Sequence, residues 1–311
     1  TLPEAVAVRA SQEFDALLAQ DCIPDTAEVL ARLHRHQAEG LLISGTVKLD
    51  AKTISNMPGQ LKIIATLSAG FDHIDIEAAK ARGLIVTNAP EGPTECTADM
   101  AMMLLLCAAR RASEYMALMQ AGWRRRLALG EILGTQVSCK TLGIIGMGRI
   151  GREMAQRVRG FGMNILYHNR NRLPEALEQG ASYYANLQDM LPHCQFLSLH
   201  APGGAGTDDL INRDTLALLP RGAILVNTAR GQLVDEDALI EALESGHLAA
   251  AGLDVFRSEP DFDLRFTQLP NVFLAPHAAS ATTESRNKMG FCALDNLAAV
   301  LSGQTAINPV V

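Results

Sequence analysis

Three side chains that suit proton transfer and anion binding each follow a short apolar run in the second half of the chain: Arg230, Glu259 and His277. Ligands of open parallel sheets bind beyond the carboxyl ends of the strands, so these groups are expected to converge on one small molecule. An imidazole donates a proton near neutral pH, a neighbouring carboxylate orients it, and a guanidinium matches the two oxygens of a carboxylate. The set suits reduction of a 2-keto acid. His277 would be the acid, Glu259 its support, and Arg230 the group that binds the substrate carboxylate and carbonyl.

Each of the three residues also has an ordinary interpretation when taken alone. Arg230 could pair with a surface acid, His277 could be a hydrogen-bonded loop histidine, and Glu259 could be a solvated charge. Their joint position after apolar runs favours catalysis. A further apolar run in the first half of the chain leads into Ser68, Ala69 and Gly70, which are expected to bind the substrate; the backbone N–H groups of Ala69 and Gly70 would hold the other side of its carboxylate.

A phosphate-binding turn is predicted where an apolar run leads into Gly146-Met147-Gly148-Arg149-Ile150-Gly151 and a helical pattern follows. In such a turn the first glycine allows the tight bend, the second lets the backbone approach a pyrophosphate, and the third lets helix and strand pack closely. The free N–H groups near Arg149 and Ile150 would face the phosphate charge. An ordinary glycine-rich turn is the alternative, but the strands predicted before and after the motif favour a dinucleotide site.

The identity of the dinucleotide depends on the end of the next predicted strand, which reads His168-Asn169-Arg170-Asn171-Arg172. A site for NAD would place an acidic residue there to bind the ribose hydroxyls. This chain has Asn169 followed by Arg170, with Arg172 close by, and a guanidinium attracts a 2′-phosphate. The sequence therefore predicts NADP, with NADPH preferred over NADH. Two solvated arginines on a loop are the alternative.

The composition excludes several other classes of protein. The chain has 311 residues, enough for two domains, with 48% hydrophobic residues and a formal charge of -7. An acidic chain is not expected to have nucleic acid or an anionic membrane as its main partner. The longest apolar run, Ala101–Ala109, is too short to cross a bilayer, and no signal peptide is visible at the start. The cysteines are scattered along the chain without a metal-binding pattern: Cys22, Cys96, Cys107, Cys139, Cys194 and Cys292. They are therefore expected to be free thiols, with no metal site, and free thiols predict a cytoplasmic location.

The elements that must position these groups are short apolar runs that alternate with helical stretches, the pattern of parallel sheets covered on both faces. They predict an α/β fold of two doubly wound, Rossmann-like domains. The first set of strands is Val6–Val8, Leu41–Ser44, Ile63–Leu67 and Ile85–Thr87; the second is Leu142–Ile145, Asn164–Tyr167, Phe196–Leu199, Ile224–Asn227, Ala250–Asp254 and Val272–Ala275. Between the sets, Pro93–Arg111 is helical and apolar almost all round, so it is expected to be buried between domains or subunits. A last helix is expected over Glu284–Leu301.

Five motifs, in order along the chain, resemble those of the D-isomer-specific 2-hydroxyacid dehydrogenase family and within it the glyoxylate/hydroxypyruvate reductase branch. They are Leu67–Asp75, Gly143–Gly151, Asn227–Gly231, Asp254–Pro260 and Ala275–Ser280. The resemblance implies catalytic roles for Arg230, Glu259 and His277. It also implies a discontinuous substrate-binding domain of residues 1–93 and 281–311, with residues 94–280 as the dinucleotide-binding domain, and closure of a cleft between the two during hydride transfer.

The same resemblance implies a homodimer that buries the region near Met103, and a tryptophan in the substrate pocket, for which Trp123 is the candidate. Glyoxylate and hydroxypyruvate are the leading substrates. Because the basic run Arg124–Arg126 departs from the pattern of that branch, 2-ketogluconate or another 2-keto acid stays open as an alternative. A corepressor-type protein that senses the dinucleotide is the alternative from another class. The implied cofactor site extends to Thr97, His200, Ala201, Pro202, Thr207, Thr228, Ala229 and Asp254, the last as an acceptor for the nicotinamide carboxamide.

Overall fold

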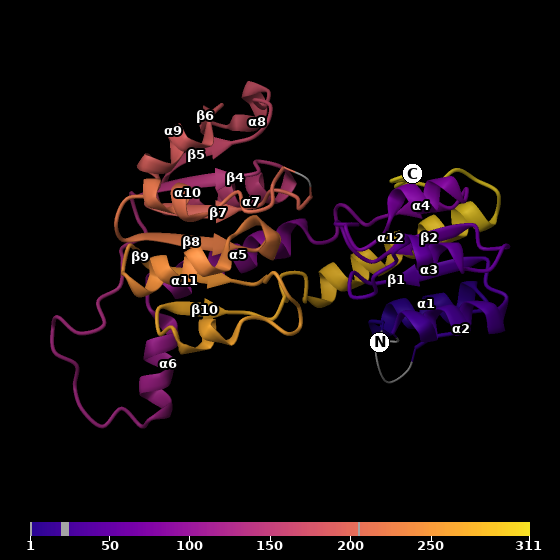
Figure 1. The fold of residues 1–311 in the computed structure, drawn as a ribbon, viewed down its shortest axis with the longest axis horizontal. Coiled ribbons are helices and arrows are strands. Elements are labelled where there is room, and N and C mark those ends of the chain that lie inside the picture. Colours follow the sequence, from indigo (N-terminus) through magenta and orange to yellow (C-terminus); the bar gives the residue numbers. More distant parts are fainter. Residues whose placement is uncertain (1, 20–24, 205) are drawn as a thin grey trace. The chain divides into compact units, whose positions relative to one another are not determined.

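The structure, a computed structural model, describes residues 2–19, 25–204 and 206–311. The chain divides into two compact units (Figure 1). Unit 1 comprises Thr1–Thr94 and Ser280–Val311, and unit 2 comprises Glu95–Ala279, so unit 1 is discontinuous in sequence. Cys22, predicted to be a free thiol, lies outside the described residues.

Unit 1 contains a parallel sheet of three strands in the order β1 (Gly40–Ile43), β2 (Ile63–Thr66) and β3 (Ile85–Thr87). Its helices are α1 (Glu4–Glu13), α2 (Thr26–His36), α3 (Ala51–Ser55), α4 (Ile76–Ala81) and α12 (Thr283–Leu301). All four residues of β2 are buried. Ile63 and Ala65 belong to the core with α1 and α12, whereas Ile64 belongs to the core with α2, α3 and α4. The sheet is therefore covered on both faces, as the apolar run at β2 predicts.

The predicted strand at Val6–Val8 is wrong, because this segment belongs to α1. The short apolar run that suggested a strand belongs to a helix in which Val6 and Ala10 lie one turn apart, on one buried face. That face packs against α12, where a Cβ built on Gly290 would lie 2.4 Å from a methyl group of Val6. The glycine lets the two helices approach closely, and a short apolar run cannot reveal such a tertiary contact.

α12 returns the chain to unit 1. The side chain of Thr282 accepts the N–H of Ser285 at 3.2 Å and so caps the helix. The hydroxyl of Ser285 donates to the carbonyl of Gly92 at 3.0 Å. The segment that leaves unit 1 and the segment that re-enters it are thus joined. Over the ranges that the structure describes, no helix is both long enough and apolar enough to span a bilayer.

Unit 2 contains a parallel sheet of seven strands in the order β10 (Val272–Leu274), β9 (Leu248–Leu253), β8 (Ala223–Asn227), β7 (Phe196–Leu199), β4 (Thr141–Ile145), β5 (Asn164–His168) and β6 (Ser182–Tyr184). The strand order reverses beside β4, the point at which open α/β sheets bind ligands. Its helices are α5 (Thr94–Ala109), α6 (Ala112–Gln120), α7 (Arg149–Arg159), α8 (Glu175–Glu178), α9 (Leu187–Met190), α10 (Arg213–Leu218) and α11 (Glu236–Glu244). Two doubly wound parallel sheets confirm the predicted fold class. The edge strand β6 is not among the predicted strands.

α5 packs one face on the sheet of its own unit. A Cβ on Gly252 of β9 would lie 2.8 Å from the Cβ of Leu104, so the absence of a side chain at Gly252 lets the helix approach the strand. Leu104 and Leu105 are fully buried, whereas Met103 is 40% exposed. Within the single chain the side of α5 that carries Met103 is therefore not covered, and its burial against another subunit stays a prediction.

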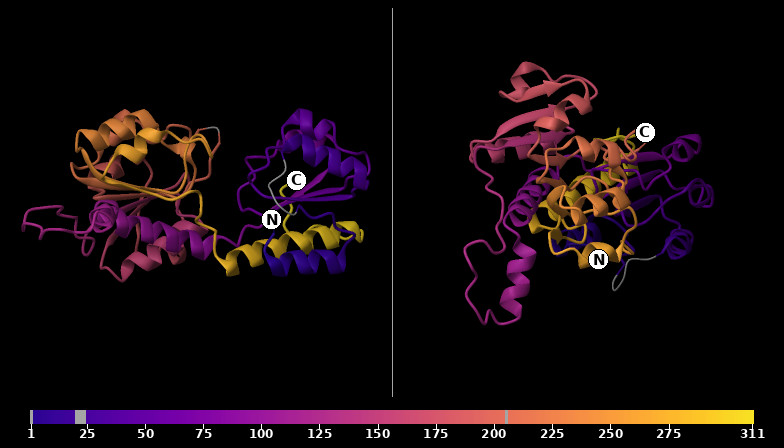
Figure 2. Two further views of the ribbon diagram at one scale, coloured as in Figure 1. Left: turned by 90° about the horizontal axis from the view of Figure 1, so that it is seen from below. Right: turned by 60° about the vertical axis from the view of Figure 1, so that its left-hand side comes forward.

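α6 and the loop that follows it form an arm, residues 112–135, which projects from the sheet of unit 2 (Figures 1 and 2). At its base the hydroxyl of Ser113 donates to the carbonyl of Val272 at 2.7 Å, and the N–H of Thr135 donates to the carbonyl of Ala109 at 2.8 Å. Large apolar side chains along the arm are exposed: Met116, Met119, Trp123, Leu129 and Leu133. Exposed apolar groups in this number indicate a contact surface.

Candidate active site

The loops after β9 and β10 bring Glu259 and His277 together. Nδ1 of His277 lies 2.5 Å from Oε2 of Glu259. The other carboxylate oxygen of Glu259 accepts the backbone N–H of Phe256 at 2.8 Å. Both side chains keep access to solvent, with 51% of His277 and 32% of Glu259 exposed. Because Glu259 occupies Nδ1, the imidazole is oriented and Nε2 is the nitrogen left to meet a ligand.

The two groups stabilise each other's charged form. The hydrogen bond to Glu259 raises the pKa of His277 above its ordinary value, although burial and the charge of Arg230 act in the opposite direction. Burial pushes the pKa of Glu259 upward, but the hydrogen bonds from His277 and from the N–H of Phe256 outweigh it and hold that pKa below its ordinary range. The pair therefore favours a protonated imidazole next to a carboxylate, the state that a proton donor needs.

Arg230 lies on the loop after β8, and Asn227 at the end of that strand sets its conformation. Asn227 is 1% exposed; its Oδ1 accepts the N–H of Ala229 at 2.9 Å, and its Nδ2 donates to the carbonyl of Arg230 at 2.8 Å. The positive charge of Arg230 lowers the pKa of both His277 and Glu259, which places the guanidinium near the pair. This role of Asn227 is not among the predicted ones, although a polar residue that ends an apolar strand is a signal for a role at the site.

Asp254, at the end of β9, holds the turn that carries His277. Its carboxylate accepts the N–H of Ala278 at 2.7 Å and that of Ala279 at 2.9 Å, and its carbonyl accepts the N–H of His277 at 2.8 Å. Burial raises the pKa of Asp254, although the two backbone donors lower it. This positioning role is not foreseen from the sequence, and the predicted contact of Asp254 with the nicotinamide carboxamide stays a prediction.

The glycine turn joins β4 to α7. Gly146 has a φ of +92°, and a Cβ there would lie 2.4 Å from the backbone nitrogen of Ala201. A Cβ on Gly151 would lie 2.3 Å from the carbonyl oxygen of Gly146. Gly148 is the N-cap of α7, and nothing lies within 4 Å of a Cβ built on it. The space in front of Gly148 and the first N–H groups of α7, at Arg149 and Ile150, fits a pyrophosphate.

The side chains that follow β5 differ in whether other groups of the protein already bind them through hydrogen bonds or ion pairs. Oδ1 of Asn169 accepts the N–H of Met147 at 2.7 Å, so the amide NH₂ group is the part left to a ligand. Arg170 is exposed, and within the described ranges no side chain or carbonyl binds its guanidinium. The guanidinium of Arg172 is bound to both carboxylate oxygens of Glu178 at 2.8 and 3.0 Å. Arg172, considered above as a second cation for the 2′-phosphate, is thus already neutralised by an acid.

Two buried polar atoms near the ends of β7 and β8 have no hydrogen-bond partner among the described residues: Nδ1 of His200 and Oγ1 of Thr228. Nε2 of His200 lies 2.8 Å from the hydroxyl of Ser198, and burial lowers the pKa of His200 to about 4, so the ring is neutral near pH 7. Buried polar atoms without partners are costly and suit a ligand that completes them. Of the other predicted cofactor residues, Ala201, Pro202 and Thr207 lie on the loop after β7, Ala229 lies after β8, and Thr97 is buried in the first turn of α5.

Ser68, Ala69 and Gly70 belong to unit 1, on the loop after β2. The hydroxyl of Ser68 donates to the carbonyl of Gly70 at 2.6 Å, and the amide of Asn88 donates to the carbonyl of Ala69 at 2.7 Å. Within the described chain no acceptor pairs with the backbone N–H of Ala69 or Gly70. The loop is therefore held through its carbonyl groups, and two adjacent N–H groups remain for an anion.

Within unit 2, the structure does not bring Trp123 to the catalytic residues. Trp123 lies on the arm and is 54% exposed. The arm returns to the sheet at Leu133, which lines a cavity of about 390 Å³ together with Ile224 and Ala249, near the starts of β8 and β9. His277, Glu259 and Arg230 follow the opposite ends of the strands. The predicted contact of Trp123 with the substrate therefore has no support within unit 2 of one chain.

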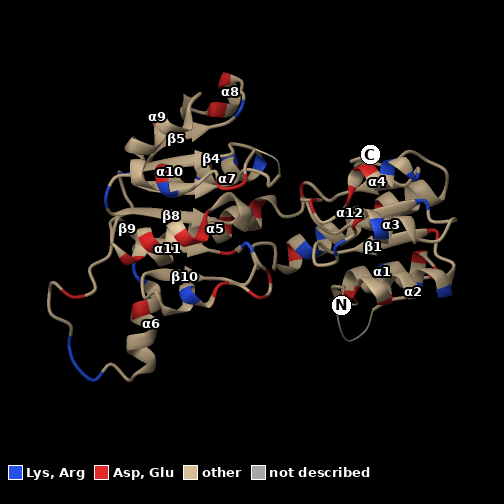
Figure 3. Cartoon of the chain, in the orientation of Figure 1, with Lys and Arg blue, Asp and Glu red and all other residues tan. Residues whose placement is uncertain are grey.

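The basic run Arg124–Arg126 lies on the same arm, where Figure 3 shows it as a blue stretch of the loop after α6. Arg125 donates to both carboxylate oxygens of Glu131 at 2.8 and 2.9 Å, and the N–H of Ala128 donates to the same carboxylate at 2.6 Å. Arg125 thus shapes the loop of the arm, and the run is not part of the catalytic loops of its own unit.

No three His, Cys, Asp or Glu side chains in the described residues are placed to hold a metal ion. The cysteines that the structure describes are free thiols: Cys96, Cys107, Cys139, Cys194 and Cys292.

A phosphate turn at the switch point of a parallel sheet, with an acid-supported imidazole at the neighbouring strand ends, is the arrangement of a nicotinamide-dependent dehydrogenase. Comparison with known proteins agrees with this class. Residues 102–279 match the family described as "D-isomer specific 2-hydroxyacid dehydrogenase, NAD binding domain". The chain belongs to the D-isomer-specific 2-hydroxyacid dehydrogenase family and is an oxidoreductase that acts on CH–OH donors with a nicotinamide cofactor.

Relatives of this chain cover nearly all of it. Glycerate dehydrogenase of Hyphomicrobium methylovorum is 41% identical over 308 residues, which are 97% of this chain and 94% of that protein. Glyoxylate/hydroxypyruvate reductase B of Klebsiella pneumoniae subsp. pneumoniae is 40% identical over 317 residues, covering 100% and 97%. The crystal structure of an NADPH-dependent glyoxylate/hydroxypyruvate reductase from Sinorhizobium meliloti, in complex with NADP and malonate, has a TM-score of 0.88 at 34% identity, covering 100% and 94%. The family, its glyoxylate/hydroxypyruvate reductase branch and the enzyme class predicted from the sequence are confirmed.

Proposed function

We propose that this chain reduces glyoxylate to glycolate, or hydroxypyruvate to the D-2-hydroxy acid, with NADPH as the preferred cofactor. The observation that carries the proposal is the 2.5 Å contact between His277 and Glu259, near the charge of Arg230 and at the carboxyl ends of neighbouring strands. The relatives named for glycerate, glyoxylate and hydroxypyruvate support the substrate class, because glycerate and hydroxypyruvate are the alcohol and ketone of one redox couple. Reduction of 2-ketogluconate or another 2-keto acid is the alternative.

His277 is the proton donor of the proposed reaction. The bound reduced nicotinamide supplies the hydride that the carbonyl carbon accepts. His277 donates a proton from Nε2 to the carbonyl oxygen, because Nδ1 is held by Glu259. Glu259 keeps the imidazole protonated before the transfer and oriented during it. One hydride, added to the carbonyl carbon, and one proton, added to the carbonyl oxygen, together convert the carbonyl group to the alcohol.

Arg230 binds the substrate carboxylate and polarises its carbonyl. A guanidinium offers two parallel donors to a carboxylate, and its charge stabilises the negative charge that develops on the carbonyl oxygen. The unpaired N–H groups of Ala69 and Gly70 complete the binding of the carboxylate. We propose that Ser68 also contributes to substrate binding, because its hydroxyl donates to the carbonyl of Gly70 and so shapes this loop.

The preference for NADPH rests on Asn169 and Arg170. Asn169 offers an NH₂ donor where a carboxylate would repel a 2′-phosphate, and Arg170 offers an uncommitted guanidinium. The glycine turn holds the pyrophosphate, and the unpartnered atoms of His200 and Thr228 supply polar contacts. The relative from Sinorhizobium meliloti that is named NADPH-dependent supports this preference.

We also propose that the chain forms a homodimer through the arm. The arm and α5 expose apolar side chains, among them Trp123 and Met103, and such surfaces are usually buried in an interface. A second copy of the chain offers the same apolar surface as a partner. The contact of Trp123 with a substrate pocket stays a prediction of the family resemblance.

A panel assay tests the function. The chain is supplied with glyoxylate, hydroxypyruvate, pyruvate or 2-ketogluconate, each with NADPH and with NADH, and oxidation of the cofactor is followed at 340 nm. The largest kcat/KM is expected for hydroxypyruvate or glyoxylate with NADPH. A larger kcat/KM for 2-ketogluconate would favour the alternative substrate, and a larger value with NADH would refute the cofactor preference. A chain that oxidises neither cofactor with any keto acid would refute the proposed reaction.

A further inference from the structure

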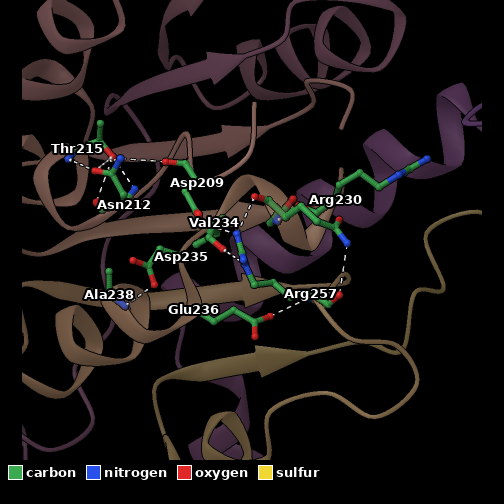
Figure 4. A network of polar contacts seen from close by, with 11 residues as sticks. Asp209, Asn212, Thr215, Arg230, Val234, Asp235, Glu236, Ala238 and Arg257 are labelled. Carbon is green, nitrogen blue, oxygen red and sulfur yellow. Dashed lines mark hydrogen bonds and ion pairs between the residues drawn. The ribbon is translucent and has the colours of Figure 1, made fainter. Parts of the chain in front are cut away.

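Arg257 connects the loop of Arg230 with the loop of Glu259 (Figure 4). Its Nε donates to the carbonyl of Val234 at 2.9 Å, and its Nη2 donates to the carbonyl of Gln232 at 3.2 Å. The same Nη2 forms an ion pair with the carboxylate of Asp209. Gln232 and Val234 lie two and four residues after Arg230 in sequence, and Arg257 itself lies two residues before Glu259. Arg257 therefore joins the two segments: its backbone belongs to the segment of Glu259, and its guanidinium binds the segment that follows Arg230.

The backbone of the Glu259 loop is fixed at the same place. The N–H of Arg257 donates to Oε1 of Glu236, in the first turn of α11, at 2.8 Å. The N–H of the preceding residue, Phe256, donates to Glu259 itself at 2.8 Å. The backbone N–H groups of two successive residues therefore bind two different carboxylates. The N–H of Arg257 donates to Glu236 on α11, and the N–H of Phe256 donates to Glu259, which supports His277. A movement of Arg257 would be transmitted to Glu259 through one residue of backbone.

The two loops touch where Gly231 crosses Phe256. A Cβ on Gly231 would lie 1.9 Å from the carbonyl carbon of Phe256 and 2.3 Å from the nitrogen of Arg257. Gly231 is the residue that follows Arg230. The loop of the guanidinium and the loop of the carboxylate are therefore in direct backbone contact, and the side chain of Arg257 fastens this contact from one side.

We infer that Arg257 is a positioning residue for the reduction: it fixes the placement of Arg230 relative to the pair formed by Glu259 and His277. This inference rests on the catalytic roles proposed above. The side chains of Arg257 and Asp209 are 37% and 50% exposed, so their ion pair adds little to the stability of the fold. Its contribution is geometric, because small misplacements of reacting groups slow catalysis strongly.

The test compares Arg257→Ala with Arg213→Ala. Arg213 is a matched control, because it forms an exposed ion pair with Glu241 in the same unit and touches neither catalytic loop. Arg257→Ala is expected to lower kcat for hydroxypyruvate about 10- to 100-fold, with the dissociation constant for NADPH and the Tm close to those of Arg213→Ala. Arg257→Lys is expected to recover part of kcat, because an ammonium can bind some of the three acceptors but not all in the same geometry.

A pH profile separates positioning from a general structural effect. His277 faces Glu259, Asp254 and Arg230. Loosening Glu259 weakens the contact that raises the pKa of His277, so the loss of activity with rising pH should begin at lower pH in Arg257→Ala than in wild type. Asp209→Asn, which keeps the guanidinium but removes its charged partner, should lower kcat less and leave Tm unchanged.

The outcomes distinguish this inference from the proposed function. A wild-type chain without keto acid reductase activity overturns both. An active wild type, with Arg257→Ala and Arg213→Ala showing the same kcat and the same pH profile, overturns only the role of Arg257. If Arg257→Ala fails to fold, Asp209→Asn decides: a lower kcat at unchanged Tm supports the inference, and a wild-type kcat overturns it.

Discussion

Asn169→Asp is expected to reverse the preference between the two nicotinamide dinucleotides. Oδ1 of Asn169 accepts the N–H of Met147 at 2.7 Å, and an aspartate of the same shape keeps that bond. At the other terminal atom an NH₂ donor becomes a carboxylate oxygen, so a favourable contact with the 2′-phosphate becomes a repulsion. Losing one charge-assisted hydrogen bond costs about 1.5–3 kcal/mol, which is about 10- to 150-fold in affinity for NADPH, and the repulsion adds to this. The new carboxylate can accept from the ribose hydroxyls of NADH.

The assay is the ratio of kcat/KM for NADPH to that for NADH at saturating hydroxypyruvate. Arg170→Ala should lower this ratio about 10-fold, and the effect should shrink as salt screens an exposed charge. Arg172→Ala is the matched control, because its guanidinium is already bound to Glu178, and the ratio should not change. The reasoning is refuted if Asn169→Asp keeps the wild-type ratio, or if Arg172→Ala lowers the ratio as much as Arg170→Ala does.

Three further predictions follow from the site and the arm. Because Glu259 raises the pKa of His277, the reduction rate should stay constant at low pH and fall as the pH rises through that raised pKa. In Glu259→Gln the fall should begin at lower pH. A kcat/KM profile identical to that of wild type would exclude the supporting role of Glu259. Gly146→Ala, which must place a Cβ against the backbone of Ala201 at positive φ, should destabilise unit 2 by about 2 kcal/mol or more, whereas Gly148→Ala should leave the Tm unchanged and weaken NADPH binding; thermal unfolding and fluorescence titration of the two variants separate these effects. Met119→Glu combined with Leu129→Glu places charges on the exposed apolar side of the arm and should dissociate the proposed dimer in sedimentation equilibrium, with no change expected if the chain is monomeric.

The strands that sequence reasoning finds are those that the sheet buries on both sides. β2 and β7 are apolar except for one hydroxyl residue each, Thr66 and Ser198, and every residue in them is buried. β6 is different, because it has three residues, lies at the edge of the sheet, and none of its side chains is fully buried. Pairing with β5 creates that strand, and nothing in its own residues requires it. The strand predicted at Val6–Val8 is wrong because a short apolar run also fits the buried face of a helix, and the packing partner of that helix, α12, is distant in sequence.

The candidate site shows a similar division. The sequence predicts which polar groups follow the strands, because strand ends are readable from apolar runs. It does not predict which of those groups a neighbour has already engaged. Arg170 and Arg172 look equivalent in sequence, yet only Arg172 is bound to Glu178, which lies on α8. That pairing depends on how the loop after β5 folds back, and the spacing of the residues does not encode it.

The distinction between reacting groups and positioning groups follows from burial. Asn227 and Asp254 are 1% and 0% exposed, and each spends its side-chain atoms on the backbone of the loop that carries a proposed catalytic residue. His277 and Glu259 stay partly exposed and bind each other. A buried polar group without its partners is costly, so Asn227 and Asp254 can be satisfied only if their loops take one conformation. The proposed catalytic side chains are therefore positioned through the backbone of their loops and remain available to bind a substrate. A search for reactive residues by type alone selects Asp254 as readily as Glu259. Their burial and the backbone donors already bound to each carboxylate tell the two roles apart: Asp254 is buried and accepts two N–H groups, whereas Glu259 is partly exposed and accepts one.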